Sequence, residues 1–172
     1  MQLMDSDYQR FYQWWQYLHD KYDEEAINRP SNRAARAHLR RCKNVVQISF
    51  EQTYVHLQQA FPDIPMECIA VIAGVLAHCK DIKLMPSNPQ DYFAKQMAGF
   101  ERDTIPVKPL RFRRLLATKT LAELYPQLLR IIAIIREPID LRSLVYGICH
   151  WNDEQKQVWA YAYYAVLPTD KE

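Results

Sequence analysis

The stretch PMECIAVIAGVLAHC, residues 65–79, decides the fold. Its apolar side chains, including Ile69, Val71 and Ile72, fall on every side of a helical wheel rather than on one stripe. A helix of this kind has no face for water, so it is stable only when other helices surround it. Pro65 suits the first turn of a helix because proline has no N–H to leave unpaired there. We therefore predict a buried central helix over residues 65–79.

Helical spacing continues in both directions from this segment. Apolar residues three and four apart, each run preceded by a capping residue, predict further helices. The predicted helices cover residues 6–22, 32–43, 49–61, 89–97, from 109 onward, 121–136, 141–150 and 153–166.

Cap residues and prolines set the expected helix boundaries. Ser49-x-x-Gln52 and Thr120-x-x-Glu123 have the spacing of capping boxes. The first of them would open a helix whose apolar stripe is Phe50, Tyr54, Leu57 and Phe61. Asp140 and Asn152 are expected to cap the last two helices, and Pro126 to kink or restart the helix before them. Residues 80–89 are predicted to be a loop.

The composition agrees with an all-α fold. Apolar residues make up 49% of the chain and 21 residues are aromatic, which is enough to build a core. Three glycines are too few for the turns of a sheet-rich protein. We predict a bundle of eight to nine helices in a single helical domain over residues 1–172, which can divide into sub-bundles 1–100 and 101–172.

The cysteines and the apolar segments indicate a cellular compartment. Cys42, Cys68, Cys79 and Cys149 show no CxxC spacing. The N-terminus is acidic and aromatic, unlike a signal peptide, and no window approaches the roughly 18 apolar residues of a membrane span. We expect reduced thiols in a cytoplasmic protein with no membrane partner.

Basic residues are concentrated in two segments without acids. Residues 27–43 and 104–122 together hold 11 of the 22 Lys and Arg residues and no Asp or Glu. The rest of the chain has 11 basic residues against 20 acidic ones. Because such segregation costs self-repulsion, it indicates a partner of opposite charge. The basic residues concerned are Arg29, Arg33, Arg36, Arg40, Arg41, Lys43, Lys108, Arg111, Arg113, Arg114 and Lys119.

The first segment places its charges on one helix face. On a wheel, Arg33, Arg36, Arg40 and Lys43 share an arc of about 80°. Phosphates spaced along a strand would neutralise guanidinium groups spaced along a helix. The alternative is a solvated face paired with acids such as Asp20 or residues 23–25.

The second segment is arranged differently. Phe112, Leu115 and Leu116 are expected to face the core, while Arg111 and Arg114 point outward together with Lys108 nearby. Arg113 lies about 200° from Arg111 and could instead pair with an acid.

Other constellations favour packing over chemistry. Trp14, Trp15, Trp151, Trp159, Tyr161, Tyr163 and Tyr164 could stack bases, but their helical spacing favours core packing for most of them. His78-Cys79 and Cys149-His150 lack metal-site spacing, since adjacent helical residues point about 100° apart. No catalytic motif is present, so we expect no enzyme activity, no metal, no cofactor and no small-molecule substrate.

An ordered set of motifs resembles the CasB family. It comprises FYQWW (11–15), AHLRR (37–41), RRLL (113–116), the leucine-rich stretch 121–135, PID (138–140), a helix ending at Trp151, and 155–164. The family often has a Gly-x-Ser-Leu-Gly-like turn where this chain has SNPQDYFAKQM (87–97), so no role is carried over to residues 84–100.

The resemblance implies a small subunit of the type I-E CRISPR Cascade complex, which serves antiviral defence. Its implied partners are the backbone and large subunits, a second copy of itself, guide RNA and target DNA. Its basic surfaces would stabilise the R-loop and the displaced strand without reading bases, because guide pairing reads the sequence. Arg40 and Arg41 match the family's arginine pair, and Arg113 and Arg114 its later basic helix. Lys80 and Lys83 resemble a basic loop of the family.

Two other classes of function stay open at this level. A helical protein–protein adaptor could dock an acidic partner on the same basic stripe. A small helical enzyme could use His38 or His150, although no motif surrounds either residue.

Overall fold

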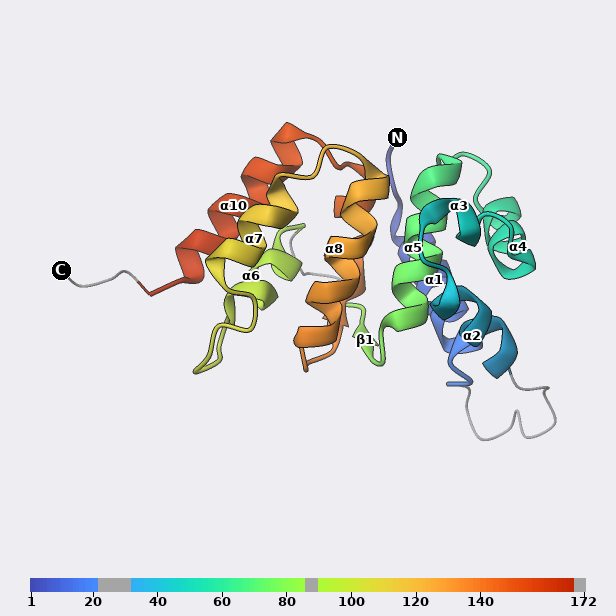
Figure 1. The fold of residues 1–172 in the computed structure, drawn as a ribbon, viewed down its shortest axis with the longest axis horizontal. Coiled ribbons are helices and arrows are strands. Elements are labelled where there is room, and N and C mark those ends of the chain that lie inside the picture. Colours follow the sequence, from blue (N-terminus) through green and yellow to red (C-terminus); the bar gives the residue numbers. More distant parts are fainter. Residues whose placement is uncertain (22–31, 86–89, 169–172) are drawn as a thin grey trace. The chain divides into compact units, whose positions relative to one another are not determined.

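The computed structural model describes residues 1–21, 32–85 and 90–168 (Figure 1). These residues form ten helices and a single two-stranded sheet, which confirms the predicted all-α class. Contacts group the chain into two compact units, Met1–Lys80 and Asp81–Glu172. The single-domain organisation stays a prediction.

The first unit is built around one buried helix. Its elements are α1 (Asp5–Leu18), α2 (Arg33–Arg41), α3 (Val45–Ile48), α4 (Gln52–Ala60) and α5 (Met66–His78). Ten consecutive residues of α5, from Cys68 to Ala77, are buried, so the predicted central helix is confirmed. The Phe11 ring of α1 stacks on Phe61 with centroids 4.1 Å apart. The Trp15 Nε1–H donates to the Cys79 carbonyl at 2.9 Å, which fixes α1 against the end of α5.

The helix predicted over residues 49–61 begins later than expected, and its capping box is wrong. Asn44 caps the short α3 instead, because its Oδ1 accepts from the Gln47 N–H at 2.9 Å. The Ser49 hydroxyl donates back to the Val46 carbonyl at 2.6 Å and so terminates α3. Phe50 therefore lies in a turn and is 78% exposed, while the other three residues of its predicted stripe are buried.

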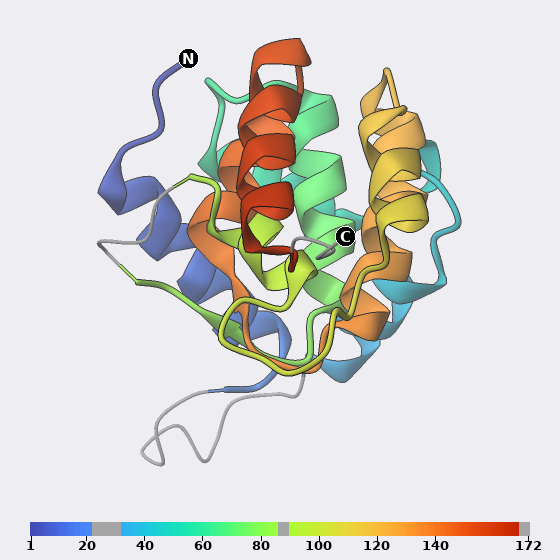
Figure 2. The same cartoon turned by 90° about the vertical axis from the view of Figure 1, so that its left-hand side faces the viewer.

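The second unit holds the remaining helices. Its elements are β1 (Ile82–Lys83), α6 (Tyr92–Ala98), α7 (Pro109–Leu116), α8 (Leu121–Ile134), β2 (Ile139–Asp140), α9 (Leu141–Cys149) and α10 (Asp153–Val166). α10 packs against α6 (Figure 2), where the Trp159 and Phe93 rings meet edge to face at 5.5 Å. The Tyr163 ring stacks on Phe112 of α7 at 3.8 Å. One aromatic helix thus holds α6 and α7 together.

The predicted loop over residues 80–89 is wrong at one point. Ile82 and Lys83 pair in parallel with Ile139 and Asp140. Burial of Ile82 and Ile139 accounts for this pairing, since two β-branched residues bring their backbones together inside the unit. The buried Gln96 side chain extends the connection by accepting from the Asp140 N–H at 3.0 Å.

The expected caps of the last helices are confirmed. Thr120 Oγ1 accepts from the Glu123 N–H at 3.2 Å, Asp140 Oδ2 from Ser143 at 2.9 Å, and Asn152 Oδ1 from Gln155 at 2.9 Å. α8 continues through Pro126 without a restart and ends two residues before its predicted end.

Helix α9 can approach α10 only because residue 147 has no side chain. A Cβ at Gly147 would lie 2.3 Å from Trp159 Cζ2. We predict that Gly147→Ala lowers the free energy of unfolding by about 1–3 kcal/mol, the usual cost of overpacking a core. Urea denaturation measures this loss. In the background of Trp159→Phe, which removes the clashing ring atoms, the same substitution should cost less; an equal cost in both backgrounds would contradict the contact.

Candidate nucleic-acid interface

Helix α2 carries four arginines and no acid within nine residues. Arg33, Arg36 and Arg40 share an arc of about 60° at 100° per residue, and Arg41 lies beside them. Arg36 is half-buried and the other three are exposed. We call these four residues the α2 basic face. Leu39 is fully buried and anchors the helix against the unit, so the arginines are fixed on a packed element.

The predicted stripe is shorter than expected at its C-terminal end. Cys42 has extended backbone angles and ends α2, so Lys43 is exposed beyond the helix rather than on its face. The Lys43 N–H donates to Gln47 Oε1 at 2.7 Å, which turns the chain into α3. The predicted position of Arg29 lies outside the described residues.

The acid that the fold brings against α2 is engaged elsewhere. Glu51 Oε2 lies 3.6 Å from His38 Nδ1, and the Cys42 thiol points at its other oxygen. Asp20, one of the acids weighed as a partner, accepts from the Asn32 N–H at 3.0 Å. The acids at 23–25, also weighed as partners, lie outside the described residues. Within residues 1–21, 32–85 and 90–168, no ion pair neutralises Arg36, Arg40 or Arg41.

Burial and the positive charge of this face lower the pKa of two nearby histidines, His19 and His78. Burial lowers the pKa of His19, its contact with the Leu76 carbonyl at 2.9 Å opposes this, and the charges of Arg36 and Arg40 lower it further. Burial and then the Arg40 charge likewise lower the pKa of His78. Both imidazoles are held toward the neutral form beside the arginines.

Helix α7 presents a second set of cations. Lys108 precedes the helix, and Arg111, Arg113 and Arg114 are all exposed on it, whereas Phe112 and Leu115 are fully buried as predicted. The expected acid partner of Arg113 is absent from the described part of the chain. Arg111 and Arg114 lie about 60° apart on the wheel. We call these cations, with the exposed Lys119 that follows the helix, the α7 basic face: Lys108, Arg111, Arg113, Arg114 and Lys119.

The remaining predicted lysines differ in availability. Lys80 is exposed at the end of the first unit. Lys83 is half-buried, and its ammonium lies 4.7 Å from the centre of the Tyr92 ring and 3.3 Å from its hydroxyl. Lys83 is thus already held by its own unit, while Lys80 has the exposure that a phosphate contact needs.

The seven aromatic residues considered for base stacking differ in their burial. Trp15, Trp159 and Tyr163 are buried as expected. Trp151 is half-buried and packs on Trp159 at 5.2 Å, and Tyr164 is 44% exposed but meets Phe112 edge to face at 5.8 Å. Packing is thus confirmed for most of the seven, while Trp14 is half-buried and Tyr161 is 81% exposed. The signal for Tyr161 was available, since it lies two positions from the buried Trp159 and Tyr163 and hence on another side of α10.

Cys79 and His150, which were considered as metal ligands, contribute to packing. Burial raises the pKa of the Cys79 thiol to about 12. The His150 ring stacks on Tyr146 at 4.0 Å. No group of three or more His, Cys, Asp or Glu side chains in the described ranges could hold a metal ion, and no helix there is long and apolar enough to cross a membrane.

The two histidines beside the α2 basic face predict a pH-dependent stability. Because the pKa values of His19 and His78 in the folded chain lie below the ordinary value of 6.5, the unfolded chain binds protons that the folded chain does not. The free energy of unfolding should therefore be largest above pH 6.5 and fall as the pH drops below it. Urea denaturation from pH 8 to pH 5.5 measures this.

The double substitution His19→Gln and His78→Gln should flatten this dependence, even if it lowers stability at pH 8. Substitution of the exposed His56 by Gln serves as the matched control and should leave the dependence as it is. An unchanged dependence in the double variant would refute the assignment.

Comparison with known proteins places the chain in a family. No curated protein and no solved structure matches it. The family model described as CRISPR-associated protein Cse2 matches residues 35–164, which is well over half of the chain. The match includes α2 from its third residue and all of α7. The chain therefore belongs to the Cse2 (CasB) family, the small subunit of the type I-E CRISPR Cascade complex.

Proposed function

We propose that the α2 and α7 basic faces bind nucleic-acid phosphates without reading bases and thereby stabilise the R-loop of guide RNA and target DNA, including the displaced strand. The observation that carries this proposal is the α2 basic face, four arginines on a nine-residue helix with no acid of its own. The family of the chain supplies the setting, a CRISPR Cascade complex.

The chemistry of these faces suits phosphates better than base edges. Guanidinium groups donate paired hydrogen bonds to phosphate oxygens, and each phosphate that is neutralised releases bound counterions. Exposed arginines around one short helix can follow a strand of any sequence. Sequence recognition is then left to guide pairing, as RNA-guided complexes require.

The same proposal assigns a positioning role rather than a catalytic one. The chain would bind the backbone and large subunits and a second copy of itself, and it would hold strands while another component acts on them. Lys43 and Lys80 are exposed and would supply further phosphate contacts in the first unit.

Charge reversal tests the proposal directly. Arg36→Glu with Arg40→Glu should weaken binding of single-stranded DNA by about tenfold or more and lower the slope of log affinity against log salt by about 1.4, or about 0.7 per lost phosphate contact. Fluorescence anisotropy across a salt series measures both quantities. In the assembled complex, the same variant should shorten the lifetime of R-loops.

Matched variants separate a local effect from loss of net charge or of fold. Arg130→Glu with Arg136→Glu changes the same charge at exposed positions outside both basic faces and should leave binding nearly unchanged. Because Arg36 is half-buried, Arg111→Glu with Arg114→Glu provides a second test on fully exposed residues. Equal losses in all three variants, or a complex with an acidic protein that survives nuclease treatment while DNA does not bind, would overturn the proposal.

A further inference from the structure

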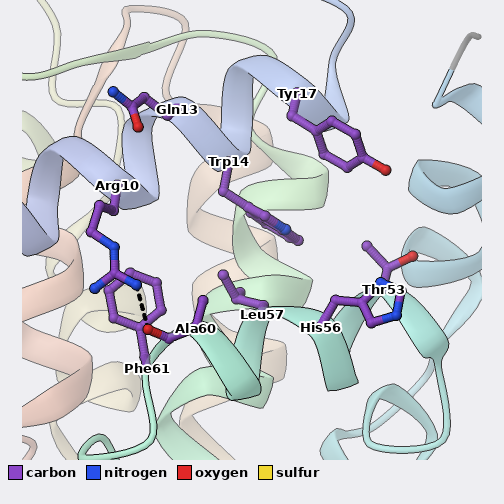
Figure 3. Close-up of a pocket in the computed structure, with 9 residues that line it drawn as sticks. All are labelled: Arg10, Gln13, Trp14, Tyr17, Thr53, His56, Leu57, Ala60 and Phe61. Atoms are coloured by element: carbon purple, nitrogen blue, oxygen red, sulfur yellow. Dashed lines mark hydrogen bonds between the residues drawn. The ribbon is translucent and has the colours of Figure 1, made fainter.

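A groove between α1 and α4 is not used by either basic face. Its volume is about 310 Å³, and residues of both helices line it (Figure 3). The floor is apolar, formed by Leu57 and Phe61, which are 2% and 4% exposed. The Trp14 side chain projects from α1 toward α4 above Leu57 (Figure 3). The groove therefore has an apolar base and an aromatic wall.

The rim of the groove has polar groups that form no hydrogen bond with the described residues. The Trp14 indole N–H, the Tyr17 hydroxyl, the Thr53 hydroxyl and the His56 ring form no hydrogen bond with any described residue. None of the described residues that line the groove is Asp or Glu. All of these groups can donate hydrogen bonds, so the groove is suited to a ligand that carries acceptors on its edge.

Arg10 is the cation among the described residues that line the groove, and it is fixed in place. The Arg10 guanidinium donates to the Ala60 carbonyl and lies 4.2 Å from the centre of the Phe61 ring (Figure 3). It is also 3.8 Å from the Asp7 carboxylate. Since Asp7 partly neutralises it, Arg10 closes one end of the groove rather than serving as an independent phosphate site. Selectivity must come from the rings and the unpartnered donors.

The other end of the groove adjoins the α2 basic face. The Asn32 side chain donates to the Tyr17 carbonyl at 2.8 Å, and Asn32 directly precedes Arg33, the first arginine of α2. The groove wall and the start of the basic face are thus tied together by one hydrogen bond. Arg33 therefore lies one residue away from a hydrogen bond to the residue at this end of the groove.

We propose that the α1–α4 groove takes one unpaired base of a single strand, stacked on Trp14, while the phosphates of that strand lie on the α2 basic face. This inference rests on the proposed function. A base fits because it is planar, its face is apolar, and its edge offers acceptors to the donors of the rim. An aromatic side chain of a partner protein would fill the floor but leave these donors unsatisfied, so the base is the better match.

A comparison of two oligonucleotides tests the inference on the full-length chain. One is a single-stranded DNA of mixed sequence, and the other has the same length and phosphates but abasic sites throughout. The wild-type chain should bind the base-bearing strand about tenfold more tightly, as stacking of one base allows. Trp14→Ala should abolish this preference and retain the affinity for the abasic strand, whereas Trp14→Phe should restore part of it. Phe50→Ala removes an exposed aromatic residue of the same unit outside the groove, and it should change nothing.

Each outcome separates this inference from the proposed function. Equal binding of both strands by the wild-type chain would overturn the groove assignment and leave the basic faces intact. No binding of either strand at low salt would overturn both. If Trp14→Ala keeps the base preference but prevents co-purification with the other Cascade subunits, the groove is a protein pocket and the inference is wrong.

Discussion

The run Cys68–Ala77 has no side that can face water, so α5 is stable only inside a layer of other helices. Helices α1, α2, α3 and α4 supply that layer within the first unit. Each covering helix needs only a narrow apolar stripe, and α2 meets this need with the fully buried Leu39 and small neighbouring residues. The rest of the α2 surface is not needed to cover α5. A short helix that anchors through one leucine can therefore carry four arginines on the outside.

The same packing sets the electrostatic character of the unit. α2 brings Arg36 and Arg40 toward His19 of α1 and His78 of α5, whose pKa values are lowered first by burial and then by these charges. Glu51, which could have offset the arginines, is directed to His38 and Cys42. The unit thus keeps positive charge next to two half-buried imidazoles that are held toward the neutral form. The second unit reaches a comparable result on α7, where Phe112 and Leu115 are buried and the cations remain outside.

How far the sequence predicts this structure depends on the range of the interactions involved. The all-round apolar pattern of residues 65–79 and the caps at Asp140 and Asn152 are local signals, and each identified its helix. The cap predicted at Ser49 was wrong because Asn44 caps a short helix, α3, just before it, and the Ser49 hydroxyl bonds to the end of that helix. The β1–β2 pairing joins residues that are far apart in sequence, so no local pattern predicts it. The α1–α4 groove was missed for the same reason, because it exists only where Trp14 and His56 are brought together by α5 and its neighbours.

The short length of α2 limits how many phosphates the α2 basic face of one chain could contact. Arg40 lies seven positions after Arg33. That is a rise of about 10 Å along a helix, or roughly three phosphates of a strand in B-form geometry. Residue Cys42 stops the helix there, so the span cannot grow by elongation of α2. Under the proposed function, the length of strand that this face protects would therefore depend on the number of copies bound, and each further copy would add a few nucleotides.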